Sequence, residues 1–547
     1  MSQSASNPNE AWGSRIGLIL AMAGNAVGLG NFLRFPSQAA NNGGGTFMIA
    51  YFTALLLLGI PLMWIEWGVG RNGGRFRKGH VPGMFAALWK HPAAKYLGAM
   101  GLVVPLIVLI YYTYIESWTL AFTFFSITKD YWGHDTQQSM VQYLQSFQSI
   151  GDSSVHGIWK PFLFFFITLF LNFWIVSKGI SGGIEKLAKI GMPVLFIFAL
   201  ILAIVVLALP AGPDGSTAAQ GLQFIYQPDF SKLGQPGVWL AAAGQIFFTL
   251  SVGMGTLQAY ASYLSTKDDI VLSGVATAAT NETAEVVLGG SIAIPAAVVF
   301  FGVTGLTQIA GSGSFNIGFA TMPVVFQNLP FGNLLGFMWF GLLFFAGITS
   351  SVAMATPIIA FFREEFGWRR EPVTWGLGAV VLAFGLLNII WFRYGMLDEW
   401  DYWGGTFGLA LFATIEVVLF MWVFKPEKAW HSMHQGADMR IPPIYKFIMT
   451  YVTPAYLFVI LGWWAWQDAW PILTLERMAG GGPVIPEHVF YVHASRAIML
   501  AFVVGFLLLI RMAWKRNGYD DRKGFVEVED TPAGALPDEQ ARVAQPV

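Results

Sequence analysis

The sequence predicts an all-α polytopic membrane protein, on three observations. Hydrophobic residues make up 55% of the chain and charged residues 12%, whereas about 25% of residues are charged in soluble domains. Apolar runs of about 20 residues, long enough to span a bilayer as a helix, recur along nearly the whole sequence. Two of these runs contain clustered glycines, which predicts that their helices are broken.

Twelve spanning helices are expected from the apolar runs. Their ranges are 12–37, 46–70, 94–124, 159–178, 184–209, 236–264, 272–303, 334–363, 373–393, 401–425, 444–470 and 490–513. The domains that we expect are an N-terminal segment (1–11), a first five-helix repeat (12–209), a second, inverted five-helix repeat (236–425), two accessory helices (444–513) and a mobile tail (517–547). The tail is acidic and rich in proline, so it cannot bury a core.

Basic residues in short loops indicate the orientation. Residues 71–95 contain six Lys or Arg residues and no acid, and an excess of positive charge marks the cytoplasmic side. Lys178, Lys186 and Lys189, and then Arg511, Lys515 and Arg516, mark the same side. We therefore expect a multi-pass protein of the plasma (inner) membrane with both termini in the cytoplasm.

The first break is expected at residues 24–31. Three glycines and two asparagines fall within this stretch of an apolar run, and each glycine costs a helix about 1 kcal/mol relative to alanine. Broken backbone survives at membrane depth only where it is buried in protein or lines a polar cavity. The segment therefore predicts such a cavity.

A second interrupted run echoes the first. The pattern of Val27–Asn31 recurs as Val252–Thr256, preceded by the polar residues Thr249 and Ser251. Paired interruptions in two halves are typical of a binding site between inverted repeats. Alternatively, the glycines are small-residue contacts between helices, an explanation that is weaker for both segments together.

Several ionisable residues fall inside the expected spans, where they are costly and usually functional. They are Arg34, Glu66, Glu116, Glu282, Glu285, Asp401 and Glu416. For each acid taken singly a structural partner is an equally good explanation, and we interpret Glu66 and Glu116 in that way.

Motifs for catalysis or nucleic-acid binding are missing from the sequence. There is no cysteine, and the HExxH, GxSxG and Walker patterns do not occur. The net charge of −1 gives no basic footprint for nucleic acid. We therefore do not expect an enzyme.

The chain resembles the neurotransmitter:sodium symporter family, and within it the bacterial leucine-transporting branch. The resemblance is carried by Trp12–Gly70 almost without gaps, and by Tyr111–Trp118, Phe247–Ser251, Asn281–Glu285, Thr349–Ser351 and Asp398–Thr406. It implies two inverted five-helix repeats in which helices one and six are broken. Broken helices at the binding site are a known feature of this family.

Two sodium sites are implied by the resemblance. The ligands of the first would be the Ala26 carbonyl, the side chains of Asn31, Thr249 and Asn281, and the substrate carboxylate. Those of the second would be the carbonyls of Gly24, Val27 and Ala346 and the hydroxyls of Thr349 and Ser350. Neutral oxygens suit a hard cation without burying further charge. Thr349 and Ser350 could instead bond back to their own helix.

The resemblance also implies a substrate pocket. Its residues would be Ala26, Gly28, Leu29, Gly30, Val108, Tyr112, Phe248, Thr249, Ser251, Met254, Ser350 and Met354. Gly28 stands where monoamine-carrying relatives have an aspartate, which leaves room for an α-carboxylate. Met254 and Met354 stand where leucine-carrying relatives have Phe and Ile. Methionine is adaptable, so we expect a broader or differently sized aliphatic selectivity, unless these residues simply conserve volume.

Ion dependence and gating follow from further matches. Glu285 stands where chloride-dependent relatives have a small polar residue, which implies that its carboxylate replaces chloride; a further hypothesis has Glu285 take a proton on the return leg. Arg34 and Asp401 are expected to close the outside. Tyr263 and Glu364 belong to the inner gate, where Asn9 replaces the family's arginine and Arg15 is a candidate substitute.

We therefore expect sodium-coupled, chloride-independent secondary active symport of a neutral, apolar amino acid into the cell by alternating access. The partners expected are the amino acid, sodium ions and the lipid bilayer, with a homodimer left open and no nucleic acid. The alternative is an ion channel or a non-transporting amino-acid receptor on the same scaffold.

Overall fold

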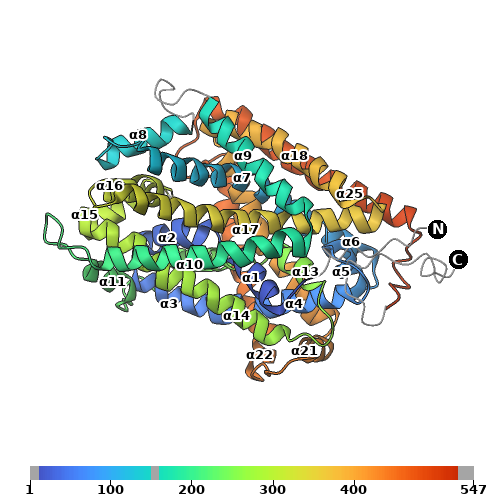
Figure 1. Cartoon of the computed structure of the whole chain (residues 1–547). Coiled ribbons are helices and arrows are strands. Elements are labelled where there is room, and N and C mark those ends of the chain that lie inside the picture. The colour runs from blue at the N-terminus through green and yellow to red at the C-terminus, as the bar shows by residue number, and fades with distance from the viewer. Residues whose placement is uncertain (1–11, 149–158, 314, 528–547) are drawn as a thin grey trace.

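The computed structural model describes residues 12–148, 159–313 and 315–527, and within them all regular structure is helical. The predicted all-α membrane fold is confirmed. Figure 1 shows long helices crossing the molecule side by side, with α5 (Val81–Leu88) and α6 (Pro92–Leu97) at one end. The short helices α8 (Gln137–Phe147), α11 (Ala218–Tyr226) and α16 (Met322–Gln327) lie at the opposite end.

Among the described residues, ten helical stretches are long and apolar enough to cross a membrane. They are Gly45–Gly74 (α3, η3, α4), Pro92–Thr128 (α6, α7), Trp159–Ser177 (α9), Ile180–Leu207 (η4, α10), Ile270–Gly311 (α14, η5, α15), Gly332–Phe366 (α17), Arg370–Ile390 (α18), Met396–Val423 (α19, η8, α20, η9), Ile444–Leu473 (α22, η10, α23, η11, α24) and Pro486–Arg516 (η12, α25).

Broken helices account for the difference from the twelve expected spans. Arg15–Ala26 (α1) and Gly30–Asn41 (η2 and α2) meet at an angle of 45° and together make an eleventh span. The remaining expected span, 236–264, is divided into α12 (Pro236–Thr249) and α13 (Thr256–Ala261). Each half is too short to cross a bilayer alone, because about 20 helical residues are needed.

Four elements place the two breaks at the centre of the bundle. The helix α17 packs along α7 (Met100–Thr128) and α10 (Lys186–Leu207), and α1 packs against α10, α14 (Ile270–Glu282) and α17. The breaks are therefore surrounded by helices rather than by lipid, as unpaired backbone at membrane depth requires.

The tail was expected to be mobile. Its described part, residues 517–527, instead packs against the basic loop, residues 71–95. Lys95 pairs with Asp521, and the Lys78 ammonium lies 4.4 Å from the ring centroid of Tyr519. Burial lowers the pKa of Lys78, but Glu365, Tyr519 and Glu364 together outweigh burial and raise that pKa above its ordinary value. Composition did not reveal these partners. Residues 1–11 and 528–547 lie outside the described residues.

Candidate functional site

The two predicted breaks are present, and their backbones differ. In the first, α1 ends at Ala26, Val27 is extended (φ −72°, ψ 97°) and η2 begins at Gly30. In the second, Gly253 (φ 76°) and Gly255 (φ 79°) adopt left-handed conformations between α12 and α13. Glycine reaches such φ values without steric cost, which explains the second glycine pair.

Hydrogen bonds tie the breaks to each other and to the bundle. The Ser251 hydroxyl donates to the Asn25 carbonyl at 2.7 Å, and the Asn25 amide donates to the Thr256 hydroxyl at 3.1 Å. The Gly253 N–H donates to a carboxylate oxygen of Glu66, on α4 (Ile60–Gly74), at 2.5 Å. This bond agrees with the structural interpretation of Glu66.

A small cavity of about 10 Å³ lies between the breaks. Its lining residues are Ala26, Gly28, Gly30, Asn31, Tyr112, Phe248, Ser251, Met254, Ser350 and Met354. Nine of the twelve residues expected at the substrate pocket are thus brought together. Leu29, Val108 and Thr249 do not line the cavity; Val108 is fully buried within α7.

Close approach at one wall of the cavity depends on Gly28. The Tyr112 hydroxyl accepts a hydrogen bond from the Leu29 N–H at 3.0 Å. A Cβ atom on Gly28 would lie 2.9 Å from that hydroxyl and 3.0 Å from the Ser350 hydroxyl. Side-chain atoms essentially never approach so closely, so the wall has no room for a side chain here.

Oxygen atoms of the residues expected at the first sodium site converge on Asn281. Its amide oxygen lies 2.8 Å from the Asn31 amide nitrogen and 3.4 Å from the Thr249 hydroxyl. The same atom lies 3.2 Å from the Ala26 carbonyl oxygen, which would be a hydrogen bond only if the amide were turned round. With the amide turned round, its nitrogen donates to the Ala26 carbonyl and its oxygen accepts from the Thr249 hydroxyl, so these residues hold together without an ion and the first sodium site stays a prediction.

Three of the five residues of the second expected sodium site, Gly24, Ala346 and Ser350, lie together. The Ser350 hydroxyl lies within 3.3 Å of the carbonyl oxygens of Gly24, Asn25 and Ala346. One hydroxyl proton can satisfy only one of these three acceptors well. Thr349 bonds back to Phe345 within α17 at 2.9 Å, as the alternative interpretation anticipated.

Glu285 is fully buried and is held by two amides. One carboxylate oxygen accepts from Gln245 at 2.8 Å and the other from Asn31 at 3.1 Å. The carboxylate thereby touches a residue expected to bind sodium. The Tyr51 hydroxyl, which also lies near Glu285, donates to Glu282 at 2.9 Å.

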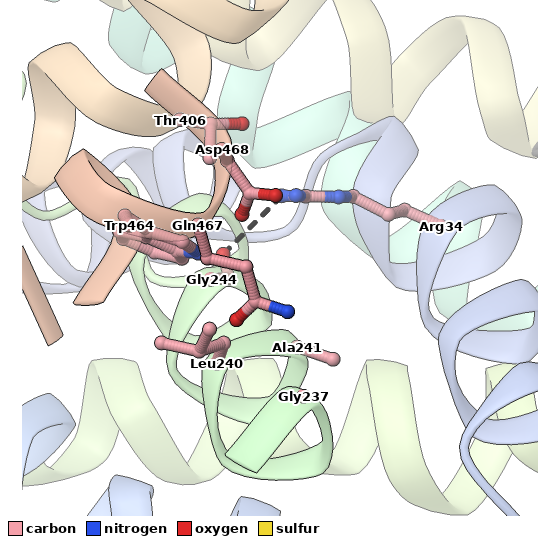
Figure 2. Close-up of a pocket in the computed structure, with 9 residues that line it drawn as sticks. All are labelled: Arg34, Gly237, Leu240, Ala241, Gly244, Thr406, Trp464, Gln467 and Asp468. Atoms are coloured by element: carbon pink, nitrogen blue, oxygen red, sulfur yellow. Dashed lines mark hydrogen bonds between the residues drawn. The ribbon is translucent and has the colours of Figure 1, made fainter. Parts of the chain in front are cut away.

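On one side of the cavity, Arg34 and Phe248 separate it from a second hollow. The Arg34 guanidinium lies 4.8 Å from the Phe248 ring centroid and donates to the Gly244 carbonyl at 3.2 Å. Figure 2 shows Arg34 reaching into this second hollow, which Trp464 and Asp468 also line.

Arg34 and Asp401 do not form a direct ion pair in the described part of the chain. Asp401 instead accepts from the Tyr111 hydroxyl at 2.7 Å, and Asp468 pairs with Arg477. The expected ion pair between Arg34 and Asp401 is therefore wrong. Arg34 is held instead by the Phe248 ring and the Gly244 carbonyl, neither of which carries a charge.

On the other side of the cavity, Trp12 covers the path toward the basic loop. Its indole N–H donates to the Tyr260 carbonyl at 3.3 Å, and the two rings meet edge to face at 5.2 Å. Glu364 accepts from the Gly79 N–H at 2.9 Å, and Tyr263 is buried nearby on the chain after α13. Asn9 lies outside the described residues. Arg15 is exposed and makes no ion pair within them.

Two residues of this region were not anticipated. Glu185, in η4 (Ile180–Glu185), holds the start of α1, and Asn172, in α9, joins Glu116 to Ser351. Both resemble ordinary helix residues in the sequence. Their partners lie more than 50 positions away, so no local signal could have identified them.

Comparisons with known proteins agree on one family. The model of the sodium:neurotransmitter symporter family matches residues 9–142 and 132–472. An uncharacterized sodium-dependent transporter of Methanocaldococcus jannaschii is 30% identical, covering 91% of this chain and 97% of that relative. The human sodium- and chloride-dependent GABA transporter 2 is 24% identical, over 81% of this chain and 78% of its own.

Among solved structures, the chain is similar to MhsT in complex with L-phenylalanine. The TM-score is 0.72 and the sequence identity 29%, and the match covers 82% of this chain and 98% of MhsT.

Proposed function

Because the chain belongs to the sodium:neurotransmitter symporter family, we propose that it carries a neutral amino acid into the cell together with sodium. It is a multi-pass membrane transporter that uses sodium, and not an enzyme. To this family assignment the proposal adds the substrate class, two sodium sites and independence of chloride. It also places the protein in the plasma membrane with both termini in the cytoplasm.

The observation that carries the proposal is the enclosed cavity between the two broken helices. Its walls combine main-chain groups of the first break with apolar side chains such as Met254, Met354 and Phe248. Backbone amides at the start of a half-helix attract a carboxylate, while the apolar wall suits an uncharged side chain. A zwitterion with an apolar side chain matches both parts.

The absence of an acid at Gly28 further supports an amino acid. A monoamine has no carboxylate of its own and would need an anionic partner, whereas Gly28 and its neighbour Tyr112 offer none. The similar transporter MhsT was solved with L-phenylalanine. We infer a neutral, apolar substrate with a side chain that the two methionines can accommodate.

Coupling would follow from a shared ligand. The cluster around Asn281 borders the cavity through Ala26 and Asn31, so a substrate carboxylate would complete the coordination of the first sodium ion. Each ligand then raises the affinity for the other, because coupling free energies are reciprocal. The second cluster, around Ser350, would hold the first break against α17 and favour the closed outer state.

Uptake of labelled amino acids into proteoliposomes tests the proposal. An inward sodium gradient should drive accumulation of one or more of alanine, leucine, methionine, phenylalanine and tryptophan, and replacing chloride with gluconate should leave it unchanged. Conductance without accumulation, or binding without transport, would contradict symport. A strict preference for one small amino acid would contradict the inferred pocket selectivity.

A further inference from the structure

The carboxylate of Glu185 fastens the beginning of the first broken helix to the fifth spanning stretch. One oxygen of this carboxylate accepts from the Gly13 N–H at 2.6 Å, and the other accepts from the Ser14 hydroxyl at 2.9 Å. Ser14 in turn caps α1 by accepting from the Gly17 N–H at 3.0 Å. Glu185 is therefore the outer member of a hydrogen-bonded chain that ends on α1.

The surroundings of Glu185 fit a tight but releasable contact. Its side chain is only 2% exposed, while its ion-pair partner Lys189, at 2.6 Å, is 43% exposed. Two of its three donors, Gly13 and Ser14, directly precede α1, so a movement of the start of α1 would remove two bonds and expose the carboxylate to water. Helix N-termini carry unpaired N–H groups and partial positive charge, which a carboxylate stabilises.

Gly17 makes room for this contact. A Cβ atom on Gly17 would lie 2.0 Å from a Glu185 carboxylate oxygen. The carboxylate can thus reach Ser14 and Gly13 only because position 17 has no side chain.

We propose that Glu185 is the inner latch of the transport cycle, a positioning residue that keeps α1 closed over the cavity from the basic-loop side. This inference rests on the proposed alternating-access symport. Trp12 closes the same helix start against Tyr260, so α1 is held from two sides. Release of Glu185 frees the side of α1 that faces α10. A latch of this kind does not need a basic residue in the N-terminal segment.

The test uses thiol accessibility, which the complete absence of native cysteine makes specific. Thr356 is buried on α17 beside Tyr260, and Thr356→Cys supplies a reporter behind the latch. In proteoliposomes with sodium, we expect Glu185→Gln to raise the labelling rate of this thiol roughly tenfold, equivalent to about 1.4 kcal/mol. In potassium, where no sodium ion would hold the first break against α17, the two rates should converge.

Two further variants separate the latch from general destabilisation. Gly17→Ala leaves every charge in place but displaces the carboxylate, so it should give the same sodium-specific increase, and combining it with Glu185→Gln should add little. Glu371→Gln, at an exposed position of α18, removes the same charge and should change nothing. Equal increases in sodium and potassium would indicate loosened structure and overturn the proposal, as would an unchanged rate in Glu185→Gln.

The uptake assay keeps the two proposals distinct. If the parent protein accumulates amino acids but Glu185→Gln labels like the parent, the latch is wrong and the symport stands. If the parent does not accumulate any amino acid, the proposed function fails whatever the thiol reports.

Discussion

Single residues set the chemistry of the cavity wall. Gly28 lets Tyr112 and Ser350 close on the backbone, and Glu285 places a buried carboxyl group next to Asn31. A larger side chain at position 28 or a neutral one at position 285 would lose these contacts, because both depend on atoms within about 3 Å of the expected ligands. Each position therefore gives a test with a definite direction.

Substituting Gly28→Ala should weaken amino-acid binding at least roughly tenfold, or about 1.4 kcal/mol. The added methyl group would force Tyr112 and Ser350 apart and narrow the cavity. Equilibrium binding of the labelled substrate in sodium measures the effect. Gly376→Ala, on α18 where a Cβ meets nothing within 4 Å, is the matched control; equal affinities in both variants would exclude a wall at Gly28.

Substituting Glu285→Ser should make uptake depend on chloride. The shorter side chain removes the carboxylate and leaves space beside Gln245 and Asn31, where an anion can restore the charge. We expect chloride to raise uptake roughly tenfold in this variant, a change of about 1.4 kcal/mol, and to have no effect on the parent protein. Chloride-dependent uptake by the parent would contradict the role given to Glu285.

At the scale of elements, the second break is fixed by its neighbours as well as by its glycines. Glu66 on α4 accepts from the Gly253 N–H, and the left-handed Gly253 lies so close to the Leu409 carbonyl that a Cβ atom would be 2.4 Å away. The break is thus held between α4 and α20 (Leu409–Val417). A polar group from one helix replaces the helical hydrogen bond that another has lost.

Glu66→Ala should destabilise the protein by about 1–3 kcal/mol, the cost of a buried unpaired N–H group. Glu66→Gln should remain close to the parent, because the amide oxygen can still accept from Gly253. Thermal unfolding in detergent, with and without sodium, compares the two variants. If glutamine destabilises as much as alanine, the negative charge matters more than the hydrogen bond to the break.

At the scale of the whole molecule, the two breaks meet in a cavity that is covered from both sides. Arg34 over Phe248 closes one side, and Trp12, Tyr260 and Glu185 close the other. A cavity closed at both ends prevents free ion flow. Under the proposed symport, the covers open in turn while the ions and the solute are bound together.

Two sodium ions per solute should make accumulation depend steeply on membrane voltage. Each charge moved inward gains about 2.3 kcal/mol per 100 mV, so two ions give roughly 4–5 kcal/mol, or about a thousandfold accumulation at about 1.4 kcal/mol per tenfold. The accumulation ratio in proteoliposomes at a clamped potassium diffusion potential measures this slope. A slope corresponding to one charge, about fortyfold per 100 mV, would contradict one of the two proposed sodium sites.

The sequence determined where the chain must break and which polar groups lie beside the breaks. Glycine and asparagine at 24–31, and glycine at 253 and 255, weaken a helix through properties of the residues themselves, and family motifs placed Asn281, Thr349 and Ser350 near them. The apolar runs likewise predicted the spans, including the two that are broken into individually short halves.

Only the tertiary structure decided how the cavity is closed. The expected pairing of Arg34 with Asp401 gives way to Phe248 and Tyr111, and Glu185 reaches Gly13 across 172 positions of the chain. Such partners depend on the register in which distant helices pack, to within about an ångström. Local propensity and hydrophobic pattern fix which face of a helix is buried, but they do not fix that register.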